Sequence, residues 1–364
     1  MGAGLYREED VPRGVGIPGF KSAMDSTGQP KASPPPVLPA EPRILVVKLS
    51  SLGDLFHALP AVHALKTGLG ARIDWVTQPA YVEVVRCFRD VERVIAFPRN
   101  SFFRSLPSFL GELRRERYDA AIDFQGLVKS GLVVRLARAG MRIGPSFHRE
   151  GARVFYSAVA GPRDKCRHAV VENLDVVRFF GLPMGEPEFD LGFPQRALSG
   201  APPRVALLPV SRWPTKNWPR ESFAEVARRL RSQAGASVFL LGGPDDVDAC
   251  AEIERLAGVP VVNLAGTLSL AETGGVLQQM QLLVTNDSGP MHMAAAAGTP
   301  VLALFGPTDP KRTGPFGPRH KVILLSLPCQ PCFQRACRHG DVRCLAGISP
   351  DQVTDAAMVM LGRR

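Results

Sequence analysis

Short apolar runs rich in β-branched residues recur along this chain of 364 residues and alternate with segments of helical period. The first run covers residues 44–47, and similar runs follow at 72–76 and 118–123. A run of this length is typical of a strand that is buried on both faces of a sheet. Strands that alternate with helices build βαβ units, so the first half of the chain predicts a parallel sheet covered by helices.

A second series of the same kind begins after the proline-rich residues 201–203. Its expected elements are a helix at 221–232 and strands at 204–208, 236–241, 281–285 and 301–305. Two successive series predict an α/β protein with two doubly wound, Rossmann-like domains that face a cleft. Because ligands of such sheets bind at the carboxyl ends of the strands, we expect the functional site in the loops that follow them.

The composition of the N-terminal residues differs from that of the rest of the chain. Residues 1–40 are rich in Gly, Pro and Ser, lack an apolar period and predict a disordered leader. We expect the two domains to occupy 41–190 and 200–364. Acidic residues at 8–10 stand where a secretory signal needs basic and then apolar residues, and no apolar run is long enough to span a membrane. These features favour a cytoplasmic protein.

The formal net charge of +10 is unevenly distributed. Residues 99–153 contain eleven Lys and Arg against five Asp and Glu, a net charge of +6. Such a surface attracts phosphates, anionic lipid headgroups or nucleic acid. The alternative interpretation is a solvated face that binds no ligand. Because no nucleic-acid-binding module accompanies the charge, we expect a small anionic ligand or a membrane surface and no nucleic acid.

The loop after the first strand ends in Gly53 and Asp54. A glycine permits close backbone approach, and a carboxylate at the next helix start can project into the cleft as a catalytic base. The alternative is that Asp54 only caps the helix. The glycine-rich dinucleotide fingerprint is missing from this loop, which argues against a nicotinamide enzyme.

Two loops of the second half carry candidate ligand-binding residues. Lys216, with Arg212 beside it, suits a diphosphate, unless the neighbouring tryptophans merely fill the domain seam. Further on, Asp287 and Ser288 precede a helix that starts near Pro290. The free amides of that helix start can bind an anion, and the Ser288 hydroxyl adds a donor. His292, in the first turn, is either a helix-surface histidine or a neighbour of the same anion.

Five ordered motifs resemble the lipopolysaccharide heptosyltransferases of glycosyltransferase family 9. They are Lys48-Leu-Ser-Ser-Leu-Gly-Asp54, Asp123-Phe-Gln-Gly-Leu-Val-Lys-Ser130, Thr215-Lys-Asn-Trp-Pro219, Asn286-Asp-Ser-Gly-Pro-Met-His292 and Phe305-Gly-Pro-Thr-Asp309. The resemblance runs from about residue 43 to the C-terminus, and the second motif is similar to the heptosyltransferase I version, which adds the first heptose onto Kdo.

The resemblance implies a GT-B fold and an inverting transfer of heptose from ADP-L-glycero-β-D-manno-heptose to the inner core of lipopolysaccharide, with no metal or other cofactor required. It gives Asp54 the role of catalytic base, and Lys216 that of stabilising the leaving diphosphate. The donor-binding residues that we expect are Lys216, Arg212, Thr215, Asp287, Ser288, Gly289 and His292.

In this interpretation, residues 41–190 form the acceptor side, and residues 200–364 bind the nucleotide sugar. The basic residues expected to meet the acceptor, a lipid A–Kdo or inner-core glycolipid, are Arg99, Arg104, Lys129, Arg149 and Arg153. An acceptor of this kind implies a peripheral location on the inner face of the inner membrane.

The C-terminal cysteines depart from the heptosyltransferase I pattern, and similar tails occur in heptosyltransferase II-like members. Four of them fall within sixteen residues: Cys329, Cys332, Cys337 and Cys344. They could hold a structural zinc ion or an iron–sulfur cluster, or they could be reduced thiols. This mixture of patterns leaves open whether the acceptor is Kdo or an attached heptose.

Two other classes of function stay open. One is a different GT-B nucleotide-sugar enzyme, either another sugar transferase or an epimerase. The other is a nucleotide- or metal-binding protein that keeps the fold without catalysis, which the joint presence of Asp54 and Lys216 disfavours.

Overall fold

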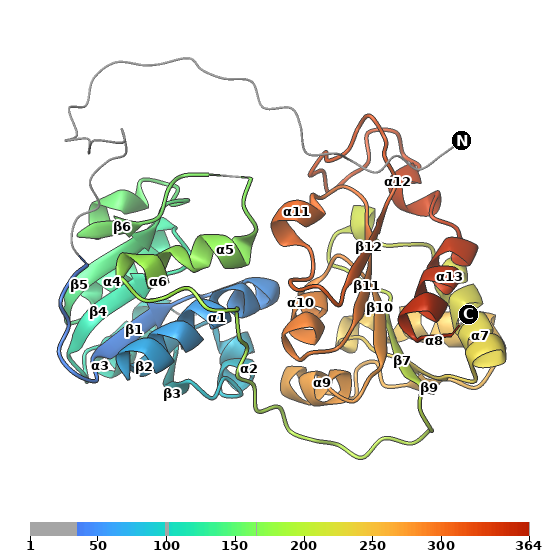
Figure 1. Ribbon diagram of the computed structural model, residues 1–364, viewed down its shortest axis with the longest axis horizontal. Coiled ribbons are helices and arrows are strands. Elements are labelled where there is room, and N and C mark those ends of the chain that lie inside the picture. The colour runs from blue at the N-terminus through green and yellow to red at the C-terminus, as the bar shows by residue number, and fades with distance from the viewer. Residues whose placement is uncertain (1–34, 99–101, 165, 364) are drawn as a thin grey trace. The chain divides into compact units, whose positions relative to one another are not determined.

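The structure is a computed structural model that describes residues 35–98, 102–164 and 166–363 (Figure 1). Residues 36–364 form one compact unit. Most of the predicted leader, 1–40, lies outside the described residues. Within its described part, the half-buried Leu38 packs against the hydrophobic core, so the packed chain begins slightly before residue 41.

The first half of the compact unit is built on a six-stranded sheet in the order β3-β2-β1-β4-β5-β6, in which every neighbouring pair is parallel. Its strands are β1 (Arg43–Val47), β2 (Arg72–Thr77), β3 (Val91–Ala96), β4 (Tyr118–Asp123), β5 (Ala139–Pro145) and β6 (Ala158–Ala160). The central strands are buried on both faces, which explains their unbroken apolar sequence.

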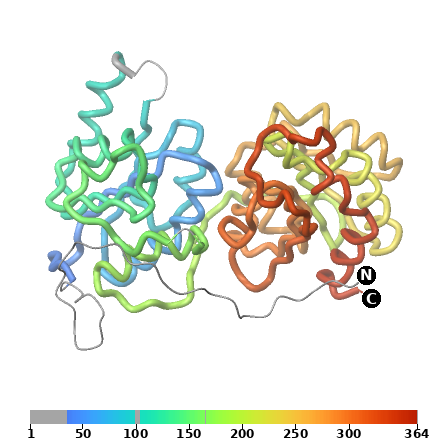
Figure 2. Tube along the Cα trace, turned by 90° about the horizontal axis from the view of Figure 1, so that it is seen from above, coloured from blue at the N-terminus to red at the C-terminus, as the bar shows by residue number. Residues whose placement is uncertain are grey.

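The second half repeats this plan with a parallel sheet in the order β12-β11-β10-β7-β8-β9. Its strands are β7 (Arg204–Leu208), β8 (Ser237–Leu240), β9 (Val262–Asn263), β10 (Leu282–Asn286), β11 (Val301–Phe305) and β12 (Lys321–Leu324). The expected pair of doubly wound sheets is therefore confirmed. The Cα trace in Figure 2 follows the chain from one sheet to the other through the linker of residues 181–203.

Helices connect the strands and cover the sheets. Those of the first half are α1 (Leu52–Leu69), α2 (Val82–Val85), α3 (Phe102–Leu113), α4 (Val128–Leu136), α5 (Ala169–Asn173) and α6 (Asp175–Phe179), with 3₁₀ turns η1 (Pro79–Tyr81) and η2 (Ala152–Phe155). Those of the second half are α7 (Arg220–Ala234), α8 (Val247–Ala257), α9 (Leu270–Leu277), α10 (Gly289–Ala296), α11 (Pro310–Thr313), α12 (Arg343–Ala346) and α13 (Pro350–Met360), with η3 (Pro214–Lys216) and η4 (Pro244–Asp246). None of the described helices combines the length and the apolar character needed to cross a membrane.

Helix α1 carries the first functional loop at its N-terminus. Leu55, Phe56, Leu59 and Val62 recur at helical spacing, and all four are fully or almost fully buried in the core. The helix ends at Gly70, whose φ of 63° places it in the left-handed region that closes many helices. A long buried helix of this kind gives its first turn a fixed position.

A buried carboxylate fastens the edge of the first sheet. The Asp74 side chain is fully buried on β2 and accepts hydrogen bonds from Arg93 Nη2 (2.8 Å) and Tyr118 Oη (2.8 Å). A second guanidinium, that of Arg43, lies 3.5 Å away. Burial and the neighbouring Asp74 charge raise the pKa of Tyr118, so this phenol stays a donor at any ordinary pH.

We expect the variant Asp74→Ala to lose about 3–5 kcal/mol of unfolding free energy, because it leaves the half-buried Arg93 guanidinium and the buried Tyr118 hydroxyl without their shared acceptor. Urea denaturation followed by circular dichroism measures this loss. The matched control is Glu92→Ala, which breaks the exposed Arg72–Glu92 pair and should cost less than about 1 kcal/mol. Equal losses in the two variants would contradict the role of Asp74.

Candidate active site

Asp54 lies in the first turn of α1, directly after the loop that follows β1. Its Oδ2 accepts hydrogen bonds from the backbone N–H and the hydroxyl of Ser51, both at 2.8 Å. Its Oδ1 makes no hydrogen bond to any described residue, and the side chain is 39% exposed. One oxygen therefore caps the helix start through Ser51, as the alternative interpretation of the sequence expects, while the base role of Asp54 stays a prediction.

Two cationic or potentially cationic groups flank this carboxylate. His57 Nδ1 lies 3.6 Å from Asp54 Oδ1 and has no hydrogen-bond partner among the described residues. Lys48 is buried beneath the loop, where its Nζ donates to the Phe124 carbonyl at 2.7 Å. Burial lowers the pKa of Lys48, although the nearby Asp54 carboxylate opposes that effect.

These groups determine the protonation state of Asp54. Burial alone would raise its pKa, but the Lys48 charge, His57 and the Ser51 amide together outweigh that effect. The net result holds the pKa of Asp54 far below its ordinary value. The carboxylate is therefore ionised throughout the neutral range, which is the state that a proton acceptor needs.

The motif at 123–130 braces the loop that carries Asp54. Gln125 Oε1 accepts hydrogen bonds from the backbone N–H groups of Leu49 (3.2 Å) and Ser50 (3.1 Å). Asp123 in turn accepts from the N–H of Gln125 at 2.7 Å and from Tyr156 Oη at 2.7 Å. The sequence showed these residues as a motif, but it gave no sign that they fix the first loop.

The N-terminal turn of α10 packs on the same loop through small residues. A Cβ added to Gly53 would fall 2.4 Å from Cδ2 of His292, so only glycine fits beneath this imidazole. Nδ1 of His292 shares a 3.0 Å hydrogen bond with His57 Nε2. Burial lowers the pKa of His292 well below its ordinary value, with the neighbouring His57 adding to the effect. His292 is thus a buried, neutral partner of His57 and not a helix-surface histidine.

Lys216 and Asp287 form an ion pair in the second half. Lys216 Nζ lies 2.6 Å from Asp287 Oδ2, and the Thr308 hydroxyl donates to the same oxygen at 2.6 Å. Asp287 is buried, whereas Lys216 is half-buried, with its ammonium 4.7 Å from the centre of the Trp213 ring. The three side chains come from the loops after β7, β10 and β11, which meet at the carboxyl edge of the sheet.

The remaining expected donor-binding residues occupy different surroundings. Ser288 precedes α10 without capping it, and its hydroxyl lies 3.4 Å from that of Thr285. Gly289 begins the helix, and because Ser288 does not cap it, the backbone amides of this first turn have no side-chain acceptor. Arg212 is exposed. The hydroxyl of Thr215 instead donates to the Gln334 carbonyl at 2.7 Å, so it contacts the C-terminal tail.

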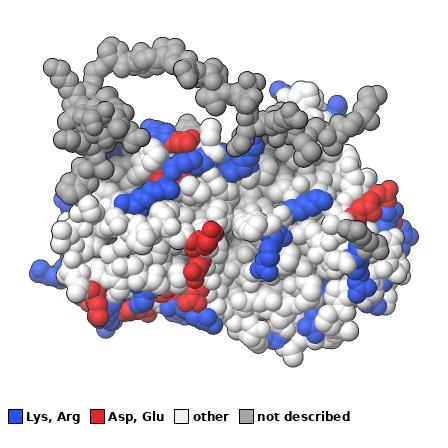
Figure 3. All heavy atoms as spheres, in the orientation of Figure 1, with Lys and Arg blue, Asp and Glu red and all other residues white. Residues whose placement is uncertain are grey.

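The structure brings together some of the expected acceptor residues. Lys129, on α4, and Arg149 and Arg153, near η2, are exposed on adjacent segments, since Arg149 N donates to the Gly126 carbonyl at 2.8 Å. Arg104 is exposed on the separate helix α3, and Arg99 lies outside the described residues. Figure 3 shows Lys and Arg gathered in runs on the face it presents, apart from the main group of acidic side chains.

The four C-terminal cysteines line a single cavity. The cavity has a volume of about 430 Å³ and lies in the loop between β12 and α12. Cys344 is buried and the other three are half-buried. Among the described residues, no three of these sulfurs lie within 4.8 Å of one another, so the thiols share a cavity without forming a closed ligand set.

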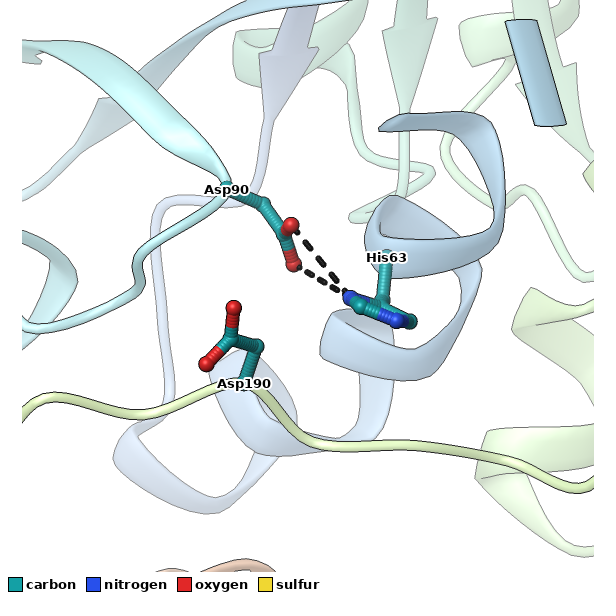
Figure 4. A group of neighbouring side chains, drawn as sticks. All are labelled: His63, Asp90 and Asp190. Atoms are coloured by element: carbon teal, nitrogen blue, oxygen red, sulfur yellow. Dashed lines mark hydrogen bonds and ion pairs between the residues drawn. The ribbon is translucent and has the colours of Figure 1, made fainter. Parts of the chain in front are cut away.

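One histidine and two aspartates, elsewhere in the described chain, do have ligand atoms that all lie within 4.8 Å of one another. They are His63 on α1, Asp90 and Asp190 (Figure 4). Nδ1 of His63 lies 3.0 Å from Asp90 Oδ2, and Asp190 pairs with Arg89 at 3.1 Å. Burial raises the pKa of Asp90, an effect that its bond to His63 opposes. Because the backbone of Arg89 also donates to the Asp190 carbonyl, we assign this group the role of fastening the linker to the first half.

Comparison with known proteins identifies the family of this chain. The family model "Glycosyltransferase family 9 (heptosyltransferase)" matches residues 107–343. Lipopolysaccharide heptosyltransferase 1 of Pseudomonas aeruginosa is 33% identical over 82% of this chain and 88% of its own length. The corresponding protein of Escherichia coli K12 is 31% identical over 80% of this chain and 98% of its own length.

The solved structure "E. coli heptosyltransferase WaaC with ADP" matches with a TM-score of 0.72 and 25% identity, over 87% of this chain and 99% of that one. This likeness, together with the two parallel six-stranded sheets, confirms the GT-B fold. Both the family match and the identity to curated relatives extend over most of the folded chain. The chain therefore belongs to glycosyltransferase family 9, the family of the heptosyltransferases.

Proposed function

We propose that this protein transfers heptose from ADP-L-glycero-β-D-manno-heptose to the inner core of lipopolysaccharide, with inversion at the anomeric carbon. The observation that carries the proposal is that one chain contains both an ionised, accessible Asp54 and the Lys216–Asp287–Thr308 cluster. Asp54 lies at the carboxyl end of the first parallel sheet, and the cluster lies at the carboxyl end of the second. Relatives named heptosyltransferase 1 support Kdo as the acceptor.

Asp54 is the proposed base of the reaction. As the acceptor oxygen bonds to the anomeric carbon, its proton becomes acidic and passes to Oδ1, the carboxylate oxygen that Ser51 does not occupy. The low pKa of Asp54 makes it a weak base before the reaction begins. Proton transfer is therefore expected late, once the new C–O bond has formed in part.

Lys216 is the proposed partner of the leaving group. The bond from the anomeric carbon to the diphosphate breaks with its electron pair on the phosphate oxygen, so negative charge grows there in the transition state. The Lys216 ammonium can follow that charge, because its stem is flexible and its partner Asp287 stays fixed by Thr308. The uncapped first turn of α10, at Ser288 and Gly289, supports donor binding as well.

The basic residues of the first half support an anionic glycolipid as the acceptor. Lys129, Arg149 and Arg153 are exposed next to the segment that braces the Asp54 loop. Such a surface would attract the phosphates and carboxylates of the inner core and the headgroups around it. We accordingly propose that the enzyme works in the cytoplasm at the inner face of the inner membrane.

The direct test is a reaction of the purified protein with ADP-heptose and a lipid A–Kdo acceptor. Mass spectrometry should find the acceptor heavier by one heptosyl residue and ADP released in equal amount. A parallel reaction with an acceptor that already carries heptose distinguishes the two possible acceptors. Consumption of ADP-heptose without any acceptor, or its conversion to an isomer, would overturn the transferase function in favour of another nucleotide-sugar enzyme.

The variant Asp54→Asn should lower kcat by about 10²–10⁴-fold, because it removes the base. Its amide oxygen can still accept from the Ser51 N–H, so the melting temperature and the affinity for ADP should change little. Steady-state kinetics, calorimetry of ADP binding and thermal melting separate these effects. Retained activity in a folded Asp54→Asn protein would rule out the base role.

Replacing Lys216 with Ala should raise the KM for the donor and lower kcat together, because the ammonium acts in both the ground and transition states. The change also leaves the buried Asp287 carboxylate without its partner. The double variant Lys216→Ala/Asp287→Asn therefore serves as the control. If the double variant regains normal donor binding and turnover, Lys216 only neutralises Asp287 and does not act on the diphosphate.

We also propose that Cys329, Cys332, Cys337 and Cys344 hold a structural metal, zinc or an iron–sulfur cluster. Four thiols around one cavity in a loop with two prolines and little apolar content support this proposal. The loop would have to draw the sulfurs closer together to complete the ligand set. A bound metal would cross-link the segments of the loop, whereas the proposed transfer reaction uses no metal.

We expect the double variant Cys332→Ser/Cys337→Ser to melt at a lower temperature and to keep a kcat near that of the unaltered enzyme in its folded fraction. Elemental analysis of the purified protein should find zinc or iron, and less of it in the variant. Cys166→Ser, at an exposed cysteine outside the loop, is the control. A protein purified without zinc or iron would refute the metal proposal.

A further inference from the structure

The loop that carries the cysteines follows β12 and therefore leaves the second sheet at its carboxyl edge. The loops that carry Lys216, Asp287 and Thr308 leave the same edge after β7, β10 and β11. A parallel sheet gathers such loops on one side, so the cysteine loop has access to the donor-binding residues even though it lies more than 100 residues from Lys216.

Three hydrogen bonds fix the cysteine loop to these neighbours. The Thr215 hydroxyl donates to the Gln334 carbonyl at 2.7 Å, and the Phe333 N–H donates to the Pro307 carbonyl at 2.8 Å. Gln330 Nε2 donates to the Gly306 carbonyl at 2.7 Å. The segment of residues 330–334 is thus anchored both to the loop that precedes Lys216 and to the loop that precedes Thr308.

Arg335 follows directly after this anchored segment. Its guanidinium carbon lies 5.0 Å from the centre of the Trp213 ring, and Lys216 Nζ lies 4.7 Å from the same centre. Both distances are within the range of a cation–π contact, so the half-buried indole holds two positive groups beside it.

The two cations differ in how their charge is compensated. Lys216 is paired with Asp287 at 2.6 Å, whereas the exposed Arg335 makes no ion pair with any described residue. Two cations beside one indole share a single carboxylate, which leaves one positive charge that an anionic ligand can take up. A diphosphate carries enough charge to engage both, and a guanidinium suits phosphate oxygens through paired N–H donors.

We propose that Arg335 is a donor-binding residue that supplies the second positive charge for the diphosphate, with Trp213 positioning it. This inference rests on the proposed donor site at Lys216 and extends that site to the cysteine loop. It also gives the cysteine loop a role in donor affinity, because whatever orders the loop places Arg335.

The experiment compares ADP and adenosine binding by isothermal titration calorimetry in the full-length protein. Arg335→Ala should weaken ADP binding by about tenfold, the size expected for one charge-assisted contact, and leave adenosine binding unchanged. The variant Arg335→Lys should retain part of the affinity for ADP, since it keeps the charge but loses the planar pair of donors. Higher salt should weaken ADP binding less in Arg335→Ala than in the unaltered protein.

The matched control is Arg338→Ala, which removes an exposed arginine three residues further along the same loop. It should leave ADP binding within about twofold of the unaltered protein, well inside the tenfold step expected for a charge-assisted contact. Equal weakening by Arg335→Ala and Arg338→Ala, or no weakening by Arg335→Ala, overturns the inference. Thermal melting of each variant checks that the loop remains folded.

ADP binding by the Lys216 variants tests the proposed donor site independently of Arg335. If Lys216→Ala/Asp287→Asn weakens ADP binding and Arg335→Ala does not, only the role of Arg335 fails. If neither weakens it, the diphosphate binds elsewhere and the proposed donor site fails with it. A loss of adenosine binding in Arg335→Ala would place the arginine at the nucleoside and contradict the diphosphate contact.

Discussion

The side chain of Gln125 holds two consecutive backbone amides of the loop after β1, and the position of the Asp54 carboxylate depends on that contact. The loop has no regular structure of its own, so its amides need an acceptor that the rest of the fold supplies. Lys48 adds a second link between the same two loops through the Phe124 carbonyl. Asp54 directly follows a loop that is fixed from beneath, and the same lysine is one of the groups that lower the pKa of Asp54.

The second half reaches a comparable result by different means. There the Lys216 ammonium is held by the buried Asp287 carboxylate, and the Thr308 hydroxyl from a third loop orients that carboxylate. A charge pair in such surroundings contributes little net stability, because desolvation offsets most of the attraction. Its contribution is to position: the single contact with Asp287 keeps the Lys216 ammonium at the edge of the sheet.

The central strands could be predicted from the sequence because they are buried on both faces. The bounds expected for β4, β7 and β11 agree with the structure, and those of β1 and β10 differ by one residue at each end or less. Strands β3 and β12, at sheet edges, were not expected, since their half-exposed residues break the apolar run. Strand β5 was missed for a related reason, because glycines and an arginine interrupt it.

The residues of the candidate site also fall into those that the sequence indicated and those that it did not. Asp54, Lys216 and Asp287 follow shortly after expected strands, so their position singled them out as candidates, and the family resemblance supplied the roles proposed for them. The roles of Gln125 and Arg335 could not be predicted, because each acts on a residue 75 or more positions away. Contacts of that kind are set by strand order, and a single sequence does not reveal which loops the order brings together.

The asymmetry of the Asp54 carboxylate has a consequence for inhibitor chemistry. One oxygen already accepts two hydrogen bonds from Ser51, which leaves the other as the natural point of attachment. A guanidinium or amidine headgroup prefers to bind both oxygens at once and would have to compete with the two Ser51 hydrogen bonds to do so. An ammonium or a single hydroxyl needs one lone pair only, so compounds with a lone, compact donor should fit this carboxylate without disturbing the helix.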